Sequence, residues 1–343
     1  MARVYDATEE CRPGSRDRWQ YIAAQRSPFY EGRGMPRYDA CSIVSEVNGF
    51  LSGERRAPSN SEPWRTGNSM HNEAWAMRAG FRGALVPGVR HIEQLVPLAL
   101  HAFGPAWFER GGYSIYFRTP TCHEETVQAF MHKPAATEHA QVGVWSEAAD
   151  GAHVLDGSLE IGSPSEPGHL RQRMIESAGR GGDLRILADH FIGQEFDQEV
   201  RCFPLELGPA IKGVAPRPGG EGQLLFRDDT TEPLDWYFGA SPWGGPVAGP
   251  QALHRLLKST ASDGGLIGGI EVRMINGPAF VDRDYVLSTR VAGIDVSPRT
   301  ENLWCETQLH DESRQLVADM LLMTRFVKQT SPLYAEEATE TKS

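Results

Sequence analysis

The chain has 343 residues, of which 40% are hydrophobic and 23% are charged. This length and composition suit two ordinary globular domains with buried cores. The net charge of −11 argues against a nucleic-acid backbone or an anionic membrane as the main partner, because an acidic surface repels both.

The five cysteines are widely separated, with no Cys-x-x-Cys pair. This pattern predicts neither a disulfide framework nor a zinc site, and no phosphate-binding or dinucleotide-binding glycine motif is present. The N-terminal stretch lacks the apolar core of a signal peptide, and no run approaches the roughly 18 apolar residues of a membrane span. We therefore expect a cytoplasmic protein that uses no metal and no cofactor.

The first 66 residues carry few clear structural signals. Residues 1–35 are rich in charge, Gly and Pro, and we expect an arm with one short helix over Asp17–Gln25. Residues 37–50 alternate loosely and fit either a strand or a helix, whereas residues 51–66 are predicted as loop.

A buried helix followed by four strands is predicted next. A short helix over residues 72–80 precedes it. The long helix runs from Gly88 to Phe103 and is apolar on more than one face, as expected for a helix wrapped by a curved sheet. Pro97 should kink it. The four strands alternate in hydrophobicity or are β-branched, and they span Tyr113–Arg118, Thr126–His132, Gln141–Ser146 and Val154–Ile161.

The same order of elements returns in the C-terminal half. A Gly- and Pro-rich linker carries a helix over Leu170–Ser177, and a second central helix is predicted over Gln251–Ser259. Four strands follow, over Leu266–Ile275, Tyr285–Val296, Leu303–Leu309 and Leu316–Phe326. The residues after Lys328 should be disordered.

The two halves align with an offset of about 160 residues, which indicates an internal duplication. A central helix wrapped by an antiparallel meander, present twice and packed as a pseudo-dimer, is a double hotdog of the α+β class. Two unrelated α+β domains are the alternative. The expected segments are an N-terminal arm (1–35), an N-terminal hotdog domain (36–162), a linker (163–195), a C-terminal hotdog domain (196–328) and a disordered tail (329–343).

One stretch of the N-terminal half carries a recognisable motif. It comprises Asn68-x-x-His71-x-Glu73, Ala79-Gly80-Phe81-x-Gly83-x-Leu85-Val86-Pro87-Gly88, the segment FGPAWFERG at 103–111, and Phe117-Arg118-x-Pro120. This stretch resembles the MaoC-like acyl dehydratases, a hotdog superfamily that includes the (R)-specific enoyl-CoA hydratases. The second half agrees with them only in pattern.

The resemblance implies a catalytic motif from which one residue is missing. In active hydratases of the family an aspartate stands five residues before the histidine and an asparagine three before it, and such groups do general acid/base work. Asn68 and His71 keep their places, but the aspartate position is Thr66, which cannot take up a proton at neutral pH. Pro87 stands where these hydratases usually carry a histidine.

His71, Asn68 and Gly88 are the principal catalytic candidates. An imidazole titrates near neutral pH, so His71 could act as general base or acid, with Asn68 orienting it or the substrate. The N–H of Gly88 at the start of the buried helix could bind a thioester carbonyl. The structural alternatives are a hydrogen-bonding role for His71 and a glycine required by a tight turn after Pro87.

Three further residues are secondary candidates. Glu73 could replace the missing acid, or it could only charge the first turn of the following helix. His91 lies one turn into the buried helix, where the alternative is a core histidine. His254 matches in spacing an aspartate of polyketide-synthase dehydratases, where the alternative is a polar helix residue. Loop acids of the second half could also supply a carboxylate: Asp228, Asp229 and Asp235.

The resemblance favours a carbon–oxygen lyase, a hydratase or dehydratase that acts on an acyl thioester of coenzyme A or acyl-carrier protein, or on a related β-hydroxy carbonyl substrate. One alternative is a repurposed biosynthetic isomerase or thioesterase-type enzyme, and another is a non-catalytic acyl-binding subunit. A homodimer is compatible with each. A cavity that brings His71 together with a second acid or base would favour an enzyme, whereas a hydrogen-bonded His71 in a filled core would favour binding alone.

Overall fold

The computed structural model describes residues 44–58, 70–104, 106–123, 125–134, 139–163, 165–177, 181–202, 265–277, 279 and 283–334. The predicted arm and the helices predicted over Asp17–Gln25 and Gln251–Ser259 lie outside these residues. Across the described part of the chain, the helices are too short or too polar to cross a membrane.

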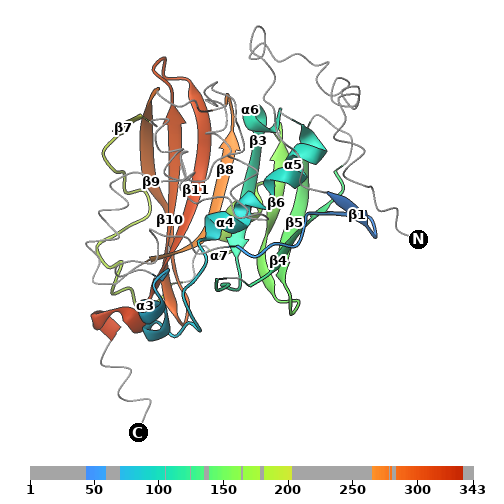
Figure 1. Cartoon of the computed structure of the whole chain (residues 1–343). Helices are drawn as coiled ribbons and strands as arrows, with labels where there is room; N and C mark the ends of the chain where they lie inside the picture. Colours follow the sequence, from blue (N-terminus) through green and yellow to red (C-terminus); the bar gives the residue numbers. More distant parts are fainter. Residues whose placement is uncertain are drawn as a thin grey trace, which may run out of the picture.

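The described strands form one sheet of 11 strands, in the order β1-β2-β4-β5-β6-β3-β8-β11-β10-β9-β7 (Figure 1). In the N-terminal half they span β1 (Ser45–Val47), β2 (Phe50–Ser52), β3 (Gly111–Phe117), β4 (Val127–His132), β5 (Ala140–Ala148) and β6 (His153–Ile161). In the C-terminal half they span β7 (Glu199–Cys202), β8 (Gly265–Met274), β9 (Asp284–Val296), β10 (Thr300–His310) and β11 (Leu316–Val327). Every strand predicted from alternation is present.

The sheet repeats one strand order about the central pair β3 and β8. On one side the order is β3-β6-β5-β4, and on the other it is β8-β11-β10-β9, so in each half the first long strand pairs with the last. The central pair is antiparallel, with Ile115 opposite Ile270 and Ser114 opposite Glu271. This is the arrangement expected of duplicated halves whose sheets join side by side.

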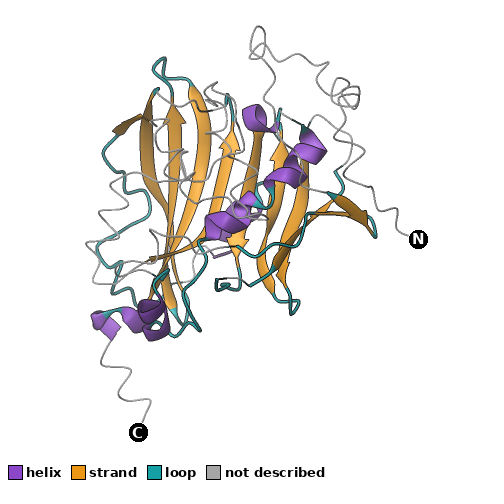
Figure 2. Cartoon of the chain, in the orientation of Figure 1, coloured by secondary structure: helices purple, strands orange, loops and turns teal. Residues whose placement is uncertain are grey.

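Helices cover one face of the N-terminal half of the sheet (Figure 2). They are α4 (Gly88–Glu93), α5 (Val96–Phe103) and α6 (Trp107–Arg110); α3 (Glu73–Arg78), α7 (His169–Ser177), η4 (Lys328–Thr330) and η5 (Pro332–Tyr334) lie elsewhere. Leu95 and Leu98 are buried in a core that also includes Ile115 of β3 and Ile270 of β8. One hydrophobic core therefore extends across both halves, which is why the amphipathic pattern appears in each.

The buried helix is broken, not kinked at Pro97 as predicted. The first part ends at Glu93, and α5 starts at Val96 with Pro97 in its first turn. Proline lacks an N–H, and its ring would collide with the carbonyl four residues earlier, which is that of Glu93. The first turn of a helix tolerates proline, so the chain ends one helix and begins another.

Two further predictions about the ends of the domain pair were wrong. Where a single strand or helix is predicted over residues 37–50, the described residues form a hairpin that extends to Ser52: β1 and β2 flank Asn48 and Gly49, whose φ angles are positive at 52° and 85°. Asn-Gly is a strong signal for such a two-residue turn, and the prediction overlooked it. The tail also begins later than predicted, because η4 and η5 continue the chain to Tyr334, which is buried.

A buried carboxylate holds the linker and the C-terminal helices to the sheet. Glu301 on β10 is 0% exposed. It accepts hydrogen bonds from the backbone N–H groups of Ile186 (2.9 Å) and Leu187 (2.8 Å) and from the hydroxyl of Tyr334 (2.7 Å). This carboxylate therefore helps to hold both the linker and η5 in place on the sheet.

Replacing Glu301 by alanine should lower the free energy of unfolding by about 2–4 kcal/mol, because several buried donors would lose their acceptor at once. Urea unfolding monitored by circular dichroism measures this change. Glu312→Ala, at an exposed position, is the matched control and should change the value by less than about 0.5 kcal/mol. Equal stability of the two variants would contradict the prediction.

Candidate active site

His71 lies just before α3, and the backbone fixes the orientation of its ring. Its Nδ1–H donates a hydrogen bond to the carbonyl of Leu85 at 2.8 Å, so Nε2 carries the lone pair that can take up a proton. The N–H of Leu85 in turn donates to the carbonyl of Met70 at 2.9 Å. Burial lowers the pKa of His71, and the bond to Leu85 opposes this only in part. The imidazole is therefore neutral at neutral pH, as a general base must be.

Gly88 begins α4, and the ring of Phe117 packs directly against it. A Cβ atom built on Gly88 would lie 2.6 Å from Cζ of Phe117, well inside van der Waals contact. Gly88 is not among the residues with positive φ, so its backbone conformation does not itself require glycine. Lack of space beside Phe117, and not the turn after Pro87, is what excludes a side chain here.

His91 is a second imidazole near the same turn. Its Nε2 lies 2.9 Å from Oγ1 of Thr121, and Nδ1 has no hydrogen-bond partner among the described residues. Burial lowers the pKa of His91 to about 4, so the ring is neutral at pH 7. Because a buried polar atom without a partner is costly, Nδ1 is a candidate contact for a polar group of a ligand.

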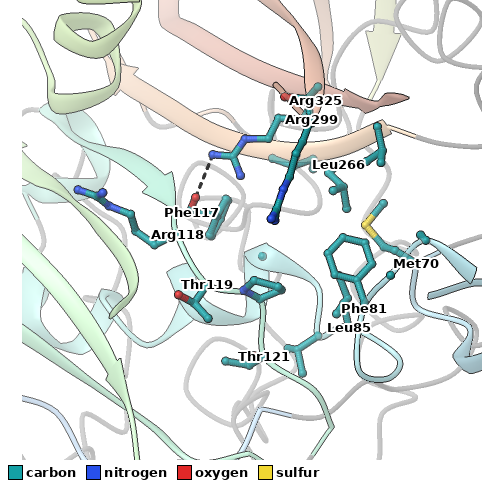
Figure 3. Close-up of a pocket in the computed structure, with 18 of the residues that line it drawn as sticks. Met70, Phe81, Leu85, Phe117, Arg118, Thr119, Thr121, Leu266, Arg299 and Arg325 are labelled. Atoms are coloured by element: carbon teal, nitrogen blue, oxygen red, sulfur yellow. Dashed lines mark hydrogen bonds between the residues drawn. The ribbon is translucent and has the colours of Figure 1, made fainter. Parts of the chain in front are cut away.

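A cavity of about 710 Å³ lies between the two halves (Figure 3). The N-terminal half lines it with His71, Gly88, His91 and Thr121, which the fold thereby brings together. The N-terminal half also contributes apolar side chains to the wall, among them Met70, Phe81, Leu85 and Phe117. The C-terminal half contributes both apolar and cationic side chains, among them Leu266, Ile267, Arg299, Arg325 and Lys328. An apolar cavity with a few polar groups is typical of a small-molecule site.

Glu73 is not among the residues that line this cavity. Its Oε2 accepts a hydrogen bond from the backbone N–H of Ala84 at 2.8 Å, and it stands in the first turn of α3. This bond ties α3 to the segment that leads to Pro87. The geometry thus gives Glu73 a structural contact close to the site.

The other predicted acids and polar groups lie outside the described residues. They are Asn68, Thr66, His254, Asp228, Asp229 and Asp235. Among the described residues that line the cavity there is no Asp or Glu, and the part of the chain that the structure describes has no cluster of His, Cys, Asp and Glu that could hold a metal ion.

Sequence reasoning missed Thr121 and two cationic residues that line the cavity, Arg299 and Arg325. Thr121 stands one residue after Pro120 of the motif, but nothing in the local pattern distinguishes a hydroxyl that meets His91 from a solvated one. Arg299 and Arg325 belong to the other half and are separated from His71 by more than 200 residues of sequence. Their place in the cavity follows from strand pairing across the whole sheet, which no local signal reports.

No protein-family model and no curated protein matches the sequence. Solved structures do match. A conserved hypothetical protein from Mycobacterium tuberculosis, described as having a double hotdog fold, superposes with a TM-score of 0.50 at 10% identity, over 79% of this chain and 93% of that one. The chain is a double hotdog. Its fold prediction is thereby confirmed.

Two other similar structures carry names that include an activity. One is named as a MaoC domain protein dehydratase from Chloroflexus aurantiacus (TM-score 0.49, 10% identity, 85% of this chain and 98% of that one). The other is named as an oleoyl thioesterase from Lactobacillus plantarum (TM-score 0.41, 12% identity, 82% and 98%). Both TM-scores are below 0.5 and both identities are low, so these two likenesses carry no argument about this chain.

Proposed function

We propose that this double hotdog is a hydratase or dehydratase of the MaoC-like type, a carbon–oxygen lyase acting on an acyl thioester. The observation that carries the proposal is His71: it lines the cavity between the halves, it is neutral, and its Nδ1–H is committed to the carbonyl of Leu85. A neutral imidazole held in this tautomer is suited to general base catalysis. A non-catalytic acyl-binding role would not require it.

In the direction of dehydration, Nε2 of His71 removes a proton from the carbon next to the thioester carbonyl. The electron pair forms the carbon–carbon double bond, and the hydroxyl on the next carbon leaves as water after it receives a proton. The N–H of Gly88 would stabilise the negative charge that develops on the carbonyl oxygen. Asn68 keeps the role that the resemblance implies, that of holding substrate or water.

We propose that the hydroxyl group of Thr121 orients the water that leaves or attacks, and that His91 holds this hydroxyl in place. Both side chains line the cavity, and they hydrogen-bond each other at 2.9 Å. Since the pKa of His91 is about 4, its protonated form is rare at pH 7, and the pair acts as a hydrogen-bonding group more than as an acid. The described lining residues include no Asp or Glu to donate the second proton, so the proton that His71 takes from the carbon is the one available to the leaving hydroxyl.

Thr121→Val should lower kcat about 10-fold with little change in KM, because the isosteric side chain fills the same space but cannot orient water. Thr121→Ser should retain most of the rate. Both values come from steady-state kinetics on the best substrate, with unfolding free energies measured in parallel. A Val variant that loses stability but keeps the wild-type kcat would assign Thr121 a structural role only.

The proposal is tested with a panel of enoyl and 3-hydroxyacyl thioesters of coenzyme A. Hydration is followed by the loss of enoyl absorbance, and thioester hydrolysis by the release of free thiol. We expect hydration of at least one substrate without thiol release. Thiol release without hydration would make the protein a thioesterase, and turnover of neither kind would favour the acyl-binding role.

A further inference from the structure

The cavity that holds His71 has a strongly one-sided charge. Four of its described lining residues are cationic and none is acidic: Arg118, Arg299, Arg325 and Lys328. Arg118 is ion-paired with Asp156, so its charge is compensated from outside the cavity. The other three come from the C-terminal half, and the remaining wall is largely apolar. Such a site attracts an anion.

Arg299 is the least compensated of these cations. The hydrogen bonds that the structure records for it involve only its backbone: its N–H donates to Oγ of Ser297 at 3.3 Å, and its carbonyl accepts from the N–H of Lys328 at 3.0 Å. These bonds hold the tip of the β9–β10 hairpin against η4. Figure 3 shows the Arg299 side chain extending from the C-terminal half toward Phe117 and Phe81. Among the described residues, no carboxylate meets its guanidinium.

Arg325 adds a second positive charge to the cavity, and its burial disfavours the charged form. Its Nη2 donates to the carbonyls of Phe117 at 3.0 Å and Gly268 at 3.4 Å, and its guanidinium lies 4.8 Å from the ring centre of Tyr116. A Cβ atom on Gly268 would lie 2.6 Å from its Nε, so a glycine makes room for it. These two carbonyl oxygens accept from Nη2 but do not cancel the positive charge, and Asp295 attracts the guanidinium without forming an ion pair with it. Burying a cation without a paired carboxylate is unfavourable.

We propose that the cavity takes an acyl thioester carrying an anionic group, a carboxylate or a phosphate, and that Arg299 binds this group while Arg325 and Lys328 supply the surrounding positive field. The thioester part rests on the proposed function, whereas the anionic group rests on the charges alone. The anion belongs either to the acyl part or to the carrier, and the test separates these two sources.

The test measures binding with thioethers, which can be neither hydrated nor hydrolysed. The probes are butyl and carboxypropyl thioethers, each made on uncharged N-acetylcysteamine and on coenzyme A, and dissociation constants are measured by calorimetry on the full chain. We expect the wild type to bind the carboxypropyl probe about 10-fold or more tightly than the butyl probe on N-acetylcysteamine, a difference typical of one charge-assisted hydrogen bond. The preference should weaken at high salt.

Arg299→Gln should abolish the preference, and Arg299→Lys should restore part of it. Arg55→Gln, at an exposed arginine that does not line the cavity, is the matched control and should leave it unchanged. If Arg299→Gln instead weakens both coenzyme A probes equally and the uncharged carrier shows no preference, the anion is the carrier's phosphate, which also supports the proposal.

Dissociation constants that do not change in Arg299→Gln for any probe would overturn it, as would a wild type that binds none of the four. Because the thioethers do not react, this result is independent of turnover. Failure of the hydratase assay would leave the anion site standing, and loss of the anion preference would leave the hydratase standing.

Discussion

Replacing His71 by alanine is expected to lower kcat/KM for the best enoyl thioester by about 10²–10⁴-fold, the usual contribution of a positioned general base. The imidazole lines the cavity, and its Nδ1–H is held by the carbonyl of Leu85, so no other atom of the residue can replace Nε2. Most of the loss should appear in kcat, because proton transfer belongs to the chemical step.

His71→Asn separates proton transfer from packing. The amide can still donate to the carbonyl of Leu85 but cannot take up a proton, so this variant should fold normally and be as inactive as His71→Ala. His190→Ala, at a histidine of the linker that does not line the cavity, should retain full activity. A His71→Asn variant with the wild-type rate would show that His71 is structural.

The pH dependence of this reaction follows from the same residue. A general base works only when it is neutral, so activity is present above the pKa of His71 and lost below it. Burial lowers that pKa, which places the acid limb of the kcat/KM profile at a lower pH than an ordinary histidine would give. The limb should disappear in the residual activity of His71→Asn.

Gly88→Ala is expected to lower kcat/KM by about 10–100-fold and the free energy of unfolding by about 1–3 kcal/mol, the usual cost of overpacking. The added methyl group would lie 2.6 Å from Cζ of Phe117. The ring must therefore move, and it is itself part of the cavity wall. The loss of activity would arise from displacement of Phe117 and of the N–H of Gly88 away from the substrate carbonyl.

A double variant tests this cause. In Gly88→Ala combined with Phe117→Leu, the shorter side chain leaves room for the methyl group, so stability should recover and part of the activity should return. Phe117→Leu alone provides the reference rate. If the second substitution rescues neither property, the requirement for glycine does not come from Phe117, and the proposed packing is wrong.

Much of the fold could be predicted because its signals are local. The strands of both halves follow from alternation, and the helix from Gly88 follows from apolar spacing. The errors also have local causes: Pro97 breaks the buried helix because of its i−4 carbonyl, and Asn48-Gly49 forms a turn that was overlooked. Of the predicted site, His71, Gly88 and His91 line one cavity, while Glu73 bonds to Ala84 beside it.

The sequence by itself determined the elements, the duplication and the motif around His71, because periodicity and short spacing are properties of neighbouring residues. Only the tertiary structure decided what surrounds that motif. The pairing of β3 with β8 brings the tip of the β9–β10 hairpin and the end of β11 to the cavity, so Arg299 and Arg325 line the same cavity as a histidine more than 200 residues away. The positive charge of the cavity therefore depends on the whole fold. It arises from strand pairing between segments that lie far apart in the sequence, and local sequence patterns do not report such pairing.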